Sequence, residues 1–319
     1  MAVYTHVPAE EMAAFVARYG VGTLRSAKGI AEGVENSNYL LDTSESRFIL
    51  TLYEKRVDAG DLPFFMALLD HLADRGLPVP RALKDRDGVQ IQTLCGRPAC
   101  LIEFLPGVSL TTPSPAQARA AGAALGAMHA ALRDFTMERP NTLGLPGWHD
   151  LAARCGDAVD DIAPGLGIRI ADELAYLEAH WPADLPRAVI HADLFPDNVL
   201  MLGDTVSGVI DFYFACTEIR AWDLAVTHSA WAFSPDGAHY RADVGRALID
   251  GYAGAFGLSA AERAALPVLA RGSALRFTLT RAWDWLNTPA DALVTRKDPL
   301  AYLRRLETYA ADGDAMFAA

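Results

Sequence analysis

The sequence predicts an α+β protein with a sheet-rich N-terminal lobe and a mostly helical C-terminal lobe. Strand-forming segments are concentrated before residue 105, whereas helical periodicity dominates the rest of the chain. Such segregation is typical of α+β folds rather than of alternating α/β folds. The length of 319 residues also exceeds what one ordinary core accommodates, so we expect two lobes, at 1–104 and 105–319.

The N-terminal lobe is predicted to contain an antiparallel sheet and two helices. Turns at Thr43–Ser46 and Asp87-Gly88 separate strand-like segments. Pro8 suits the first turn of one helix, and Asp61 can cap the other. The predicted elements are a helix over 8–19, three strands within 22–53, a helix over 61–75, and strands at about 89–94 and 98–104.

The C-terminal lobe begins after a break at 105–107. Ser114 and Pro115 suit the start of its first helix. A short β island, formed by AVIHADLF, NVLML and SGVIDF, interrupts the helices between 188 and 212. The predicted helices span 114–133, 148–160, 168–180, 222–232, 238–255, 259–286 and 299–310.

The composition is that of an ordinary globular protein and argues against two kinds of partner. Apolar residues make up 51% and the formal net charge is −12, so the chain lacks the basic excess that a long nucleic-acid surface requires. No stretch of the sequence reaches the ~20 apolar residues of a membrane span. No CxxC pair occurs and the N-terminus has no signal-like run, so we expect a cytoplasmic protein with free thiols.

The segment HADLFPDN at 191–198, followed by VIDF, carries the predicted chemistry. Phosphoryl transfer needs a carboxylate beside the attacking hydroxyl and oxygen ligands for the Mg²⁺ that bridges the phosphates. We expect Asp193 to orient the hydroxyl and accept its proton, and Asn198 and Asp211 to bind Mg²⁺. Two short strands turned back at Gly203 would bring both metal ligands to the same end of a hairpin.

The alternative is that these are ordinary turn residues. Asp and Asn favour turns, so each is uninformative alone, and Asp211 could simply end an edge strand. The combined pattern instead resembles the catalytic loop and metal loop of the protein-kinase fold. Within the catalytic site we expect His191 to act as a scaffold that donates to a loop carbonyl or to Asp211. We expect Asp223 to cap the helix over 222–232 and to steady the loop after Asp211.

The ATP site is predicted from a glycine-bearing turn between the first two strands. Backbone N–H groups around Gly29 and Gly33 can cradle phosphates, and Ser37 and Asn38 add donors. A plain hairpin turn is the alternative, because two glycines in a loop are weak evidence. Backbone groups of a hinge would pair with the adenine edge, and this hinge is predicted to comprise Glu103, Phe104 and Leu105.

These motifs resemble the aminoglycoside phosphotransferase and choline kinase superfamily over nearly the whole chain. The resemblance is closest to bacterial homoserine kinases of the kinase-like type, and it rests on GIAEGVENSNY, LTLYEKR, DLPFF, HADLFPDN and IDFYFAC. It implies a two-lobed protein-kinase-like fold, with nucleotide bound by 1–104 and substrate by 105–319. It also implies ATP and Mg²⁺ as cofactors and phosphorylation of L-homoserine, a step toward threonine. Composition and spacing alone support only a small-molecule kinase.

One position departs from the kinase pattern. Kinases usually carry a lysine on the third strand, paired with a helix glutamate. Thr51 stands where that lysine is expected, and the helix over 61–75 contains no glutamate. Either the pair is absent, or Lys28, Lys55 or Arg56 replaces the lysine. The homoserine kinases that the chain resembles share the LTL pattern around this threonine.

Homoserine carries an ammonium and a carboxylate, so its site should offer an acidic group and a basic one. Asp193, Tyr213 and Glu32 are candidates near the catalytic strand, and Arg276 or Arg281 would bind the carboxylate. A solvated or ion-paired helix face is the alternative for the two arginines.

Two other functions remain compatible with the sequence. The same chemistry could act on another small alcohol, such as choline, methylthioribose or an aminoglycoside. A catalytically silent, kinase-shaped binding protein is the other alternative, suggested by Thr51. Asp193, Asn198 and Asp211 together argue against it, because a silent protein has little use for all three. The oligomeric state is left open.

Overall fold

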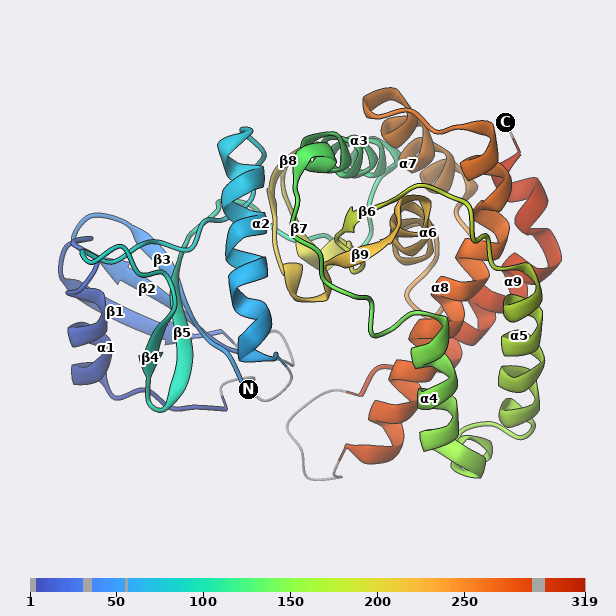
Figure 1. Cartoon of the computed structure of the whole chain (residues 1–319), viewed down its shortest axis with the longest axis horizontal. Helices are drawn as coiled ribbons and strands as arrows, with labels where there is room; N and C mark the ends of the chain where they lie inside the picture. The colour runs from blue at the N-terminus through green and yellow to red at the C-terminus, as the bar shows by residue number, and fades with distance from the viewer. Residues whose placement is uncertain (1–3, 31–35, 55–56, 289–295, 319) are drawn as a thin grey trace. The chain divides into compact units, whose positions relative to one another are not determined.

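The chain has the predicted segregation of sheet and helices, shown by the computed structural model in Figure 1. The structure describes residues 4–30, 36–54, 57–288 and 296–318. Two compact units make up the chain. Unit 1 comprises Met1–Gly107 and Ser207–Tyr213, and unit 2 comprises Val108–Val206 and Phe214–Ala319.

Unit 1 is built from a five-stranded antiparallel sheet and two helices. Its elements are α1 (Ala9–Val16), β1 (Leu24–Gly29), β2 (Ser37–Thr43), β3 (Arg47–Leu52), α2 (Leu62–Asp74), β4 (Gln92–Leu94) and β5 (Arg97–Glu103). The strand order is β1-β2-β3-β5-β4. Tyr39 and Leu41 of β2 are buried because alternate residues of a strand face the same side. Met12 and Phe15 of α1 join them in one core.

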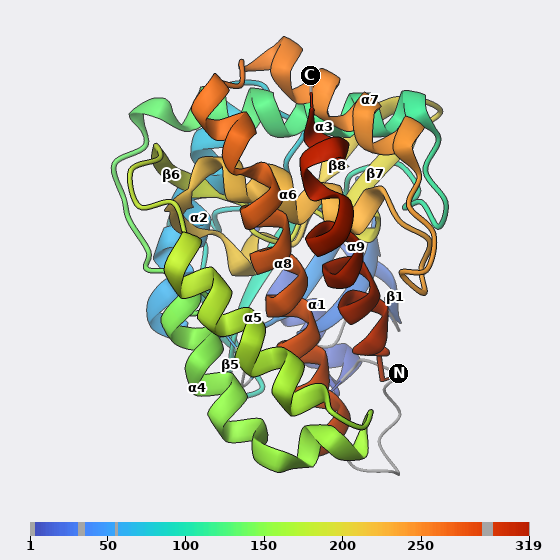
Figure 2. The same cartoon turned by 90° about the vertical axis from the view of Figure 1, so that its right-hand side faces the viewer.

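Unit 2 is mostly helical. Its helices are α3 (Pro115–Ala131), α4 (Leu145–Cys155), α5 (Leu166–His180), α6 (Arg220–Trp231), α7 (Ala242–Ala255), α8 (Ala260–Asn287) and α9 (Leu300–Phe317). Ser114 and Ser259 close capping boxes at the starts of α3 and α8. Helix α8 contacts α4, α5, α6 and α9, and Figure 2 shows α8 and α9 running side by side. No helix in the described ranges is long and apolar enough to cross a membrane.

Two short sheets replace the single β island predicted between 188 and 212. Strand β6 (Arg187–Ile190) pairs with β9 (Cys216–Ile219), and β7 (Val199–Leu202) pairs with β8 (Thr205–Val209). The sequence interpretation missed β9 because its four residues, CTEI, include two polar side chains and run directly into α6.

Candidate active site

The loop between β6 and β7, here called the catalytic loop (191–198), has an unusual backbone. Ala192 has a φ of 62°, in the left-handed region that residues other than glycine rarely adopt. The N–H of Phe195 donates to the carbonyl of Asp193 at 2.8 Å, and the N–H of Asn198 donates to the carbonyl of Phe195 at 3.0 Å. A strained residue persists only where its surroundings hold it, so we expect hydrogen bonds around Ala192 to stabilise this backbone conformation.

The carboxylate of Asp223, on α6, binds backbone N–H groups of the catalytic loop. Its oxygens accept the N–H groups of His191 and Ala192, each at 2.8 Å. Nε2 of His129 lies 3.1 Å from the same carboxylate, and Nδ1 of His129 lies 2.9 Å from the hydroxyl of Tyr252. Burial by itself would raise the pKa of Asp223, but His129 and His191 outweigh it and lower that pKa. The expectation that Asp223 caps α6 was wrong, since no side chain caps that helix.

Two further side chains hold carbonyl groups of the catalytic loop. Nε1 of Trp231, at the end of α6, donates to the carbonyl of Leu194 at 2.9 Å. The guanidinium of Arg276, on α8, donates to the carbonyl of Ala192. Both side chains are buried, Arg276 being only 2% exposed. Arg276, one of the two arginines predicted as candidates to bind the substrate's carboxylate, therefore contacts the backbone of the loop.

Asp193 and Asn198 lie together in the catalytic loop. Nδ2 of Asn198 donates to the carbonyl of Asp193 at 2.8 Å and lies 3.3 Å from its Oδ2, which leaves the amide oxygen as the atom that can bind a cation. Nδ1 of His191 accepts the N–H of Asp193 at 3.2 Å, so the imidazole contacts the loop backbone. Burial raises the pKa of Asp193 to about 6, and the cations Arg276 and Lys297 oppose that rise.

Asp211 belongs to unit 1 and follows β8. Its φ of 66° is again left-handed, and a short 3-10 helix, Phe212–Phe214, comes directly after it. The N–H of Val209 donates to the carbonyl of Pro78 at 2.8 Å, which ties this strand to unit 1. The carboxylate of Asp211 in unit 1 and the amide oxygen of Asn198 in unit 2 are each of a donor type that suits Mg²⁺. In the described part of the chain, no group of three or more His, Cys, Asp or Glu side chains is placed to hold a metal.

The predicted phosphate turn is described only at its ends, because Gly33 and Glu32 lie outside the described residues. Gly29 ends β1 and is exposed. Ser37 and Asn38 begin β2, where Ser37 is fully buried.

Ser37, Asn38 and Thr51 all have partners within unit 1. The hydroxyl of Ser37 donates to Glu54 at 2.7 Å, and the hydroxyl of Thr51 donates to Oδ1 of Asn38 at 2.7 Å. The position where kinases carry a lysine thus holds a buried hydroxyl bonded to β2. Lys28 is exposed on β1 and is the one described alternative to that lysine. The other two, Lys55 and Arg56, lie outside the described residues.

The predicted hinge lies at the end of β5. The N–H of Glu103 donates to the carbonyl of Arg81 at 2.9 Å, and the Glu103 carboxylate accepts the Arg81 N–H at 3.0 Å. Phe104 is 37% exposed, with the guanidinium of Arg47 6.0 Å from its ring centroid. Leu105 is half-buried. The chain leaves the sheet here.

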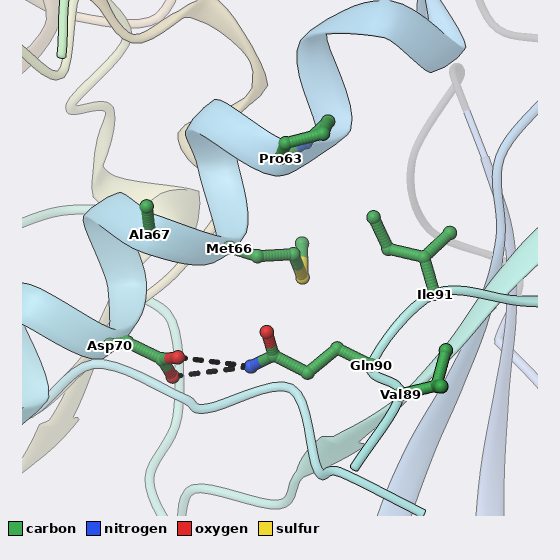
Figure 3. Close-up of a pocket in the computed structure, with 7 residues that line it drawn as sticks. All are labelled: Pro63, Met66, Ala67, Asp70, Val89, Gln90 and Ile91. Carbon is green, nitrogen blue, oxygen red and sulfur yellow. Dashed lines mark hydrogen bonds between the residues drawn. The ribbon is translucent and has the colours of Figure 1, made fainter. Parts of the chain in front are cut away.

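A pocket of about 370 Å³ opens elsewhere in unit 1, between α2 and the segment before β4 (Figure 3). At its edge Nε2 of Gln90 donates to both carboxylate oxygens of Asp70, at 3.1 and 3.3 Å. Met66 and Ile91 form part of its apolar lining. None of the predicted site residues lines it, so it is separate from the site predicted from the sequence.

The remaining predicted substrate residues occupy different units. Tyr213, in unit 1, packs edge-on against Tyr53 and Phe65, with ring centroids 5.5 and 5.6 Å away. Arg281, on α8 in unit 2, donates to the carbonyl of Asp298 at 3.1 Å.

Sequence reasoning missed Trp231, which holds the catalytic loop, and His129, which contacts Asp223, and it assigned Asp223 to a helix cap and to the loop after Asp211. A signal was present for Asp223, because a buried acid inside the apolar run AWDLAV must find donors. Nothing in the sequence indicated which donors these are, since they are backbone N–H groups about thirty residues away.

Known proteins resemble this chain in sequence and in fold. The family model described as the phosphotransferase enzyme family matches residues 26–258. A homoserine kinase of Zymomonas mobilis is 59% identical over 311 residues, covering 97% of both chains. A homoserine kinase of Methylobacterium radiotolerans is 54% identical over 315 residues, covering 99% of this chain and 98% of that protein.

Solved structures support the fold. A spectinomycin phosphotransferase in complex with ADP and spectinomycin has a TM-score of 0.75 at 14% identity, covering 97% of this chain and 99% of its own. At this identity the likeness concerns the fold alone, which is the two-lobed kinase-like fold predicted from the motifs. The match of the family model over most of the chain shows that the protein belongs to the phosphotransferase enzyme family.

Proposed function

We propose that this protein transfers the γ-phosphate of ATP to the hydroxyl of L-homoserine, a step toward threonine in the cytoplasm. The observation that carries the proposal is the identity of 59% and 54% to two homoserine kinases over almost the full length of each. The catalytic loop supports it, because an acid held in a fixed loop is what phosphoryl transfer to an alcohol requires.

In this proposal Asp193 orients the hydroxyl of the substrate and accepts its proton. The raised pKa of about 6 gives Asp193 more basicity than an ordinary aspartate, while leaving it ionised at neutral pH. Asn198 and Asp211 would hold Mg²⁺, which neutralises charge on the phosphates when bound. His191 supports the loop through its bond to the Asp193 N–H.

The nucleotide would be bound by unit 1. Backbone N–H groups of the segment between Gly29 and Ser37, which includes Gly33, would contact the phosphates, with Asn38 at the start of β2 as a further donor. Backbone groups of Glu103, Phe104 and Leu105 would pair with the adenine edge.

A coupled assay with ATP, Mg²⁺ and a panel of alcohols tests this function. We expect turnover of homoserine well above that of choline, methylthioribose or an aminoglycoside. Asp193→Asn should lower kcat by roughly 10²–10⁴-fold while leaving nucleotide affinity largely unchanged. Asp204→Asn is the matched control, because Asp204 is an exposed acid in the turn between β7 and β8, outside the catalytic loop. Turnover of choline but not of homoserine would refute the substrate, and an active Asp193→Asn variant would refute the role of Asp193.

A further inference from the structure

Several basic side chains of unit 2, among them three that interact electrostatically with Asp193, form no ion pair with an acidic side chain of the described residues. Within the described residues, Arg276, Arg281 and Arg305 donate only to backbone carbonyls. Lys297 is exposed close by and forms no ion pair with a described residue. Guanidinium groups withdrawn from water are costly unless an opposite charge compensates them. An anionic ligand would supply that charge.

Aromatic rings connect two of these cations to the catalytic loop. The ring centroid of Phe195 lies 5.0 Å from that of Phe277 and 6.3 Å from that of Tyr302. The guanidinium of Arg281 lies 4.5 Å from the ring centroid of Tyr302, and Nζ of Lys297 lies 5.9 Å from that of Phe195. Both cations therefore border one aromatic group that begins in the catalytic loop itself.

No acidic side chain among the described residues forms an ion pair with Arg281 or Lys297. The carboxylate of Asp298 accepts a backbone N–H at 2.8 Å and faces Arg304 at 3.6 Å, while Arg281 contacts only its carbonyl. Asp193 is close enough to interact electrostatically with both cations. Lys297 is among the groups that interact electrostatically with Asp193, and Tyr302, Asp298 and Asp193 are among those that interact with Arg281.

We propose that Arg281 and Lys297 form a subsite for the carboxylate of the amino-acid substrate. This inference rests on the proposed function. In homoserine a chain of four bonds, about 5 Å when extended, separates the hydroxyl oxygen from the carboxylate carbon. A hydroxyl that faces Asp193 therefore brings the carboxylate into the region of the cations that interact with Asp193. Arg276, whose guanidinium holds the Ala192 carbonyl, positions the catalytic loop instead.

The subsite selects among alcohols by charge. A carboxylate gains charge-assisted hydrogen bonds from a guanidinium and an ammonium. A quaternary ammonium such as that of choline would meet like charges there, which disfavours it. The two cations would thus separate amino-acid alcohols from alcohols that carry only a positive group.

The test compares homoserine with 3-amino-1-propanol, which is homoserine without its carboxylate. For the wild type we expect kcat/KM to favour homoserine by at least roughly 10²-fold. Arg281→Ala and Lys297→Ala should each lower kcat/KM for homoserine by roughly 10- to 100-fold and leave 3-amino-1-propanol nearly unchanged. Arg304→Ala is the control, because Arg304 faces the same Asp298 from α9. The exposed Lys297 provides a variant that should fold even if Arg281→Ala does not.

Each outcome decides the question. If the variants lose kcat/KM for homoserine but not for 3-amino-1-propanol, mainly because KM rises, the subsite is supported. An equal fall in kcat/KM for both alcohols, together with a higher KM for ATP, would assign the cations to the nucleotide phosphates and overturn the proposal. An unchanged ratio of kcat/KM for homoserine to that for 3-amino-1-propanol in both variants would also overturn it. If the wild type itself does not phosphorylate homoserine, the proposed function fails and the subsite fails with it. Failure confined to the variants leaves that function standing.

Discussion

Asp223 contributes two hydrogen bonds to the catalytic loop, and its replacement by an isosteric amide tests how much that loop depends on them. In Asp223→Asn only one oxygen remains, so either the N–H of His191 or that of Ala192 must face an NH₂ group. We expect a loss of about 2–4 kcal/mol in the free energy of unfolding, because a buried donor loses its partner. We also expect kcat to fall more than nucleotide affinity does.

Urea unfolding and steady-state kinetics measure both effects of the Asp223 variant. Asp250→Asn is the matched control, since Asp250 is an acid of α7 whose pair with Arg119 is exposed, and surface pairs contribute little. If Asp223→Asn were as stable and as active as the control, the loop would not need this carboxylate.

The buried His228 should make the free energy of unfolding depend on pH. Its imidazole is fully buried, with Nδ1 2.7 Å from the hydroxyl of Tyr309, and burial lowers its pKa to about 3. The unfolded chain, with an ordinary histidine pKa, binds a proton below about pH 6.5 that the folded protein excludes. The folded state therefore loses stability as pH falls from about 6.5 toward 3, by about 1.4 kcal/mol between pH 7.5 and 5.5.

His228→Asn removes this titration while keeping a polar group beside Tyr309. We expect the variant to be less stable at neutral pH, yet to lose less additional stability on acidification than the wild type does. Urea unfolding at the two pH values measures the difference, with the exposed His180→Asn as control. An acid-induced loss identical in wild type and variant would contradict the prediction.

The side chains of the candidate site divide according to how local their partners are. The proximity of Asp193 and Asn198 could be predicted from the sequence because they lie in one short segment, and the structure places them in contact. The roles of Asp223 and Arg276 could not, because both act on the loop backbone from helices distant in the sequence. A pattern shows which residue types are present, but it does not show which carbonyl a buried guanidinium will reach.

At the scale of elements, glycines set the closest approach between helices α3 and α7. A Cβ at Gly251 would overlap the carbonyl oxygen of Arg119, and one at Gly122 would overlap that of Leu248. Gly251→Ala should therefore destabilise the protein by about 1–3 kcal/mol or more, because the backbones must separate. Gly254→Ala, on the same helix with nothing within 4 Å of its Cβ, should be neutral or stabilise by up to about 1 kcal/mol. Thermal unfolding distinguishes the two variants. Equal changes in stability for Gly251→Ala and Gly254→Ala would contradict the close packing of α3 against α7.

The helices and most strands were predictable because periodicity and caps act locally. Ser114 and Ser259 begin helices where the sequence placed them. Strand β9 was not predictable, because a four-residue strand exists only through its pairing with β6. Local preference is weak at that length, so tertiary context decides the conformation.

At the scale of the whole molecule, unit 1 includes a segment that the sequence places far from it, Ser207–Tyr213. The hydroxyl of Ser207 donates to the carbonyl of Pro106 at 2.6 Å, and Tyr213 packs on Tyr53 and Phe65. Tyr213→Ala should therefore weaken unit 1, by about 2 kcal/mol for a half-buried ring. Hydrogen exchange of the intact chain should report faster exchange in β3, and Val89→Ala, an exposed apolar residue of unit 1, is the control.

The same experiment tests whether the two units open separately. If unit 1 has its own stability, the faster exchange caused by Tyr213→Ala stays within its strands and leaves the amides of α8 unchanged. Tyr252→Ala should do the reverse, because Tyr252 is fully buried in unit 2. If either substitution made hydrogen exchange faster in both units, the chain would unfold as one cooperative body, although its internal contacts divide it into two units.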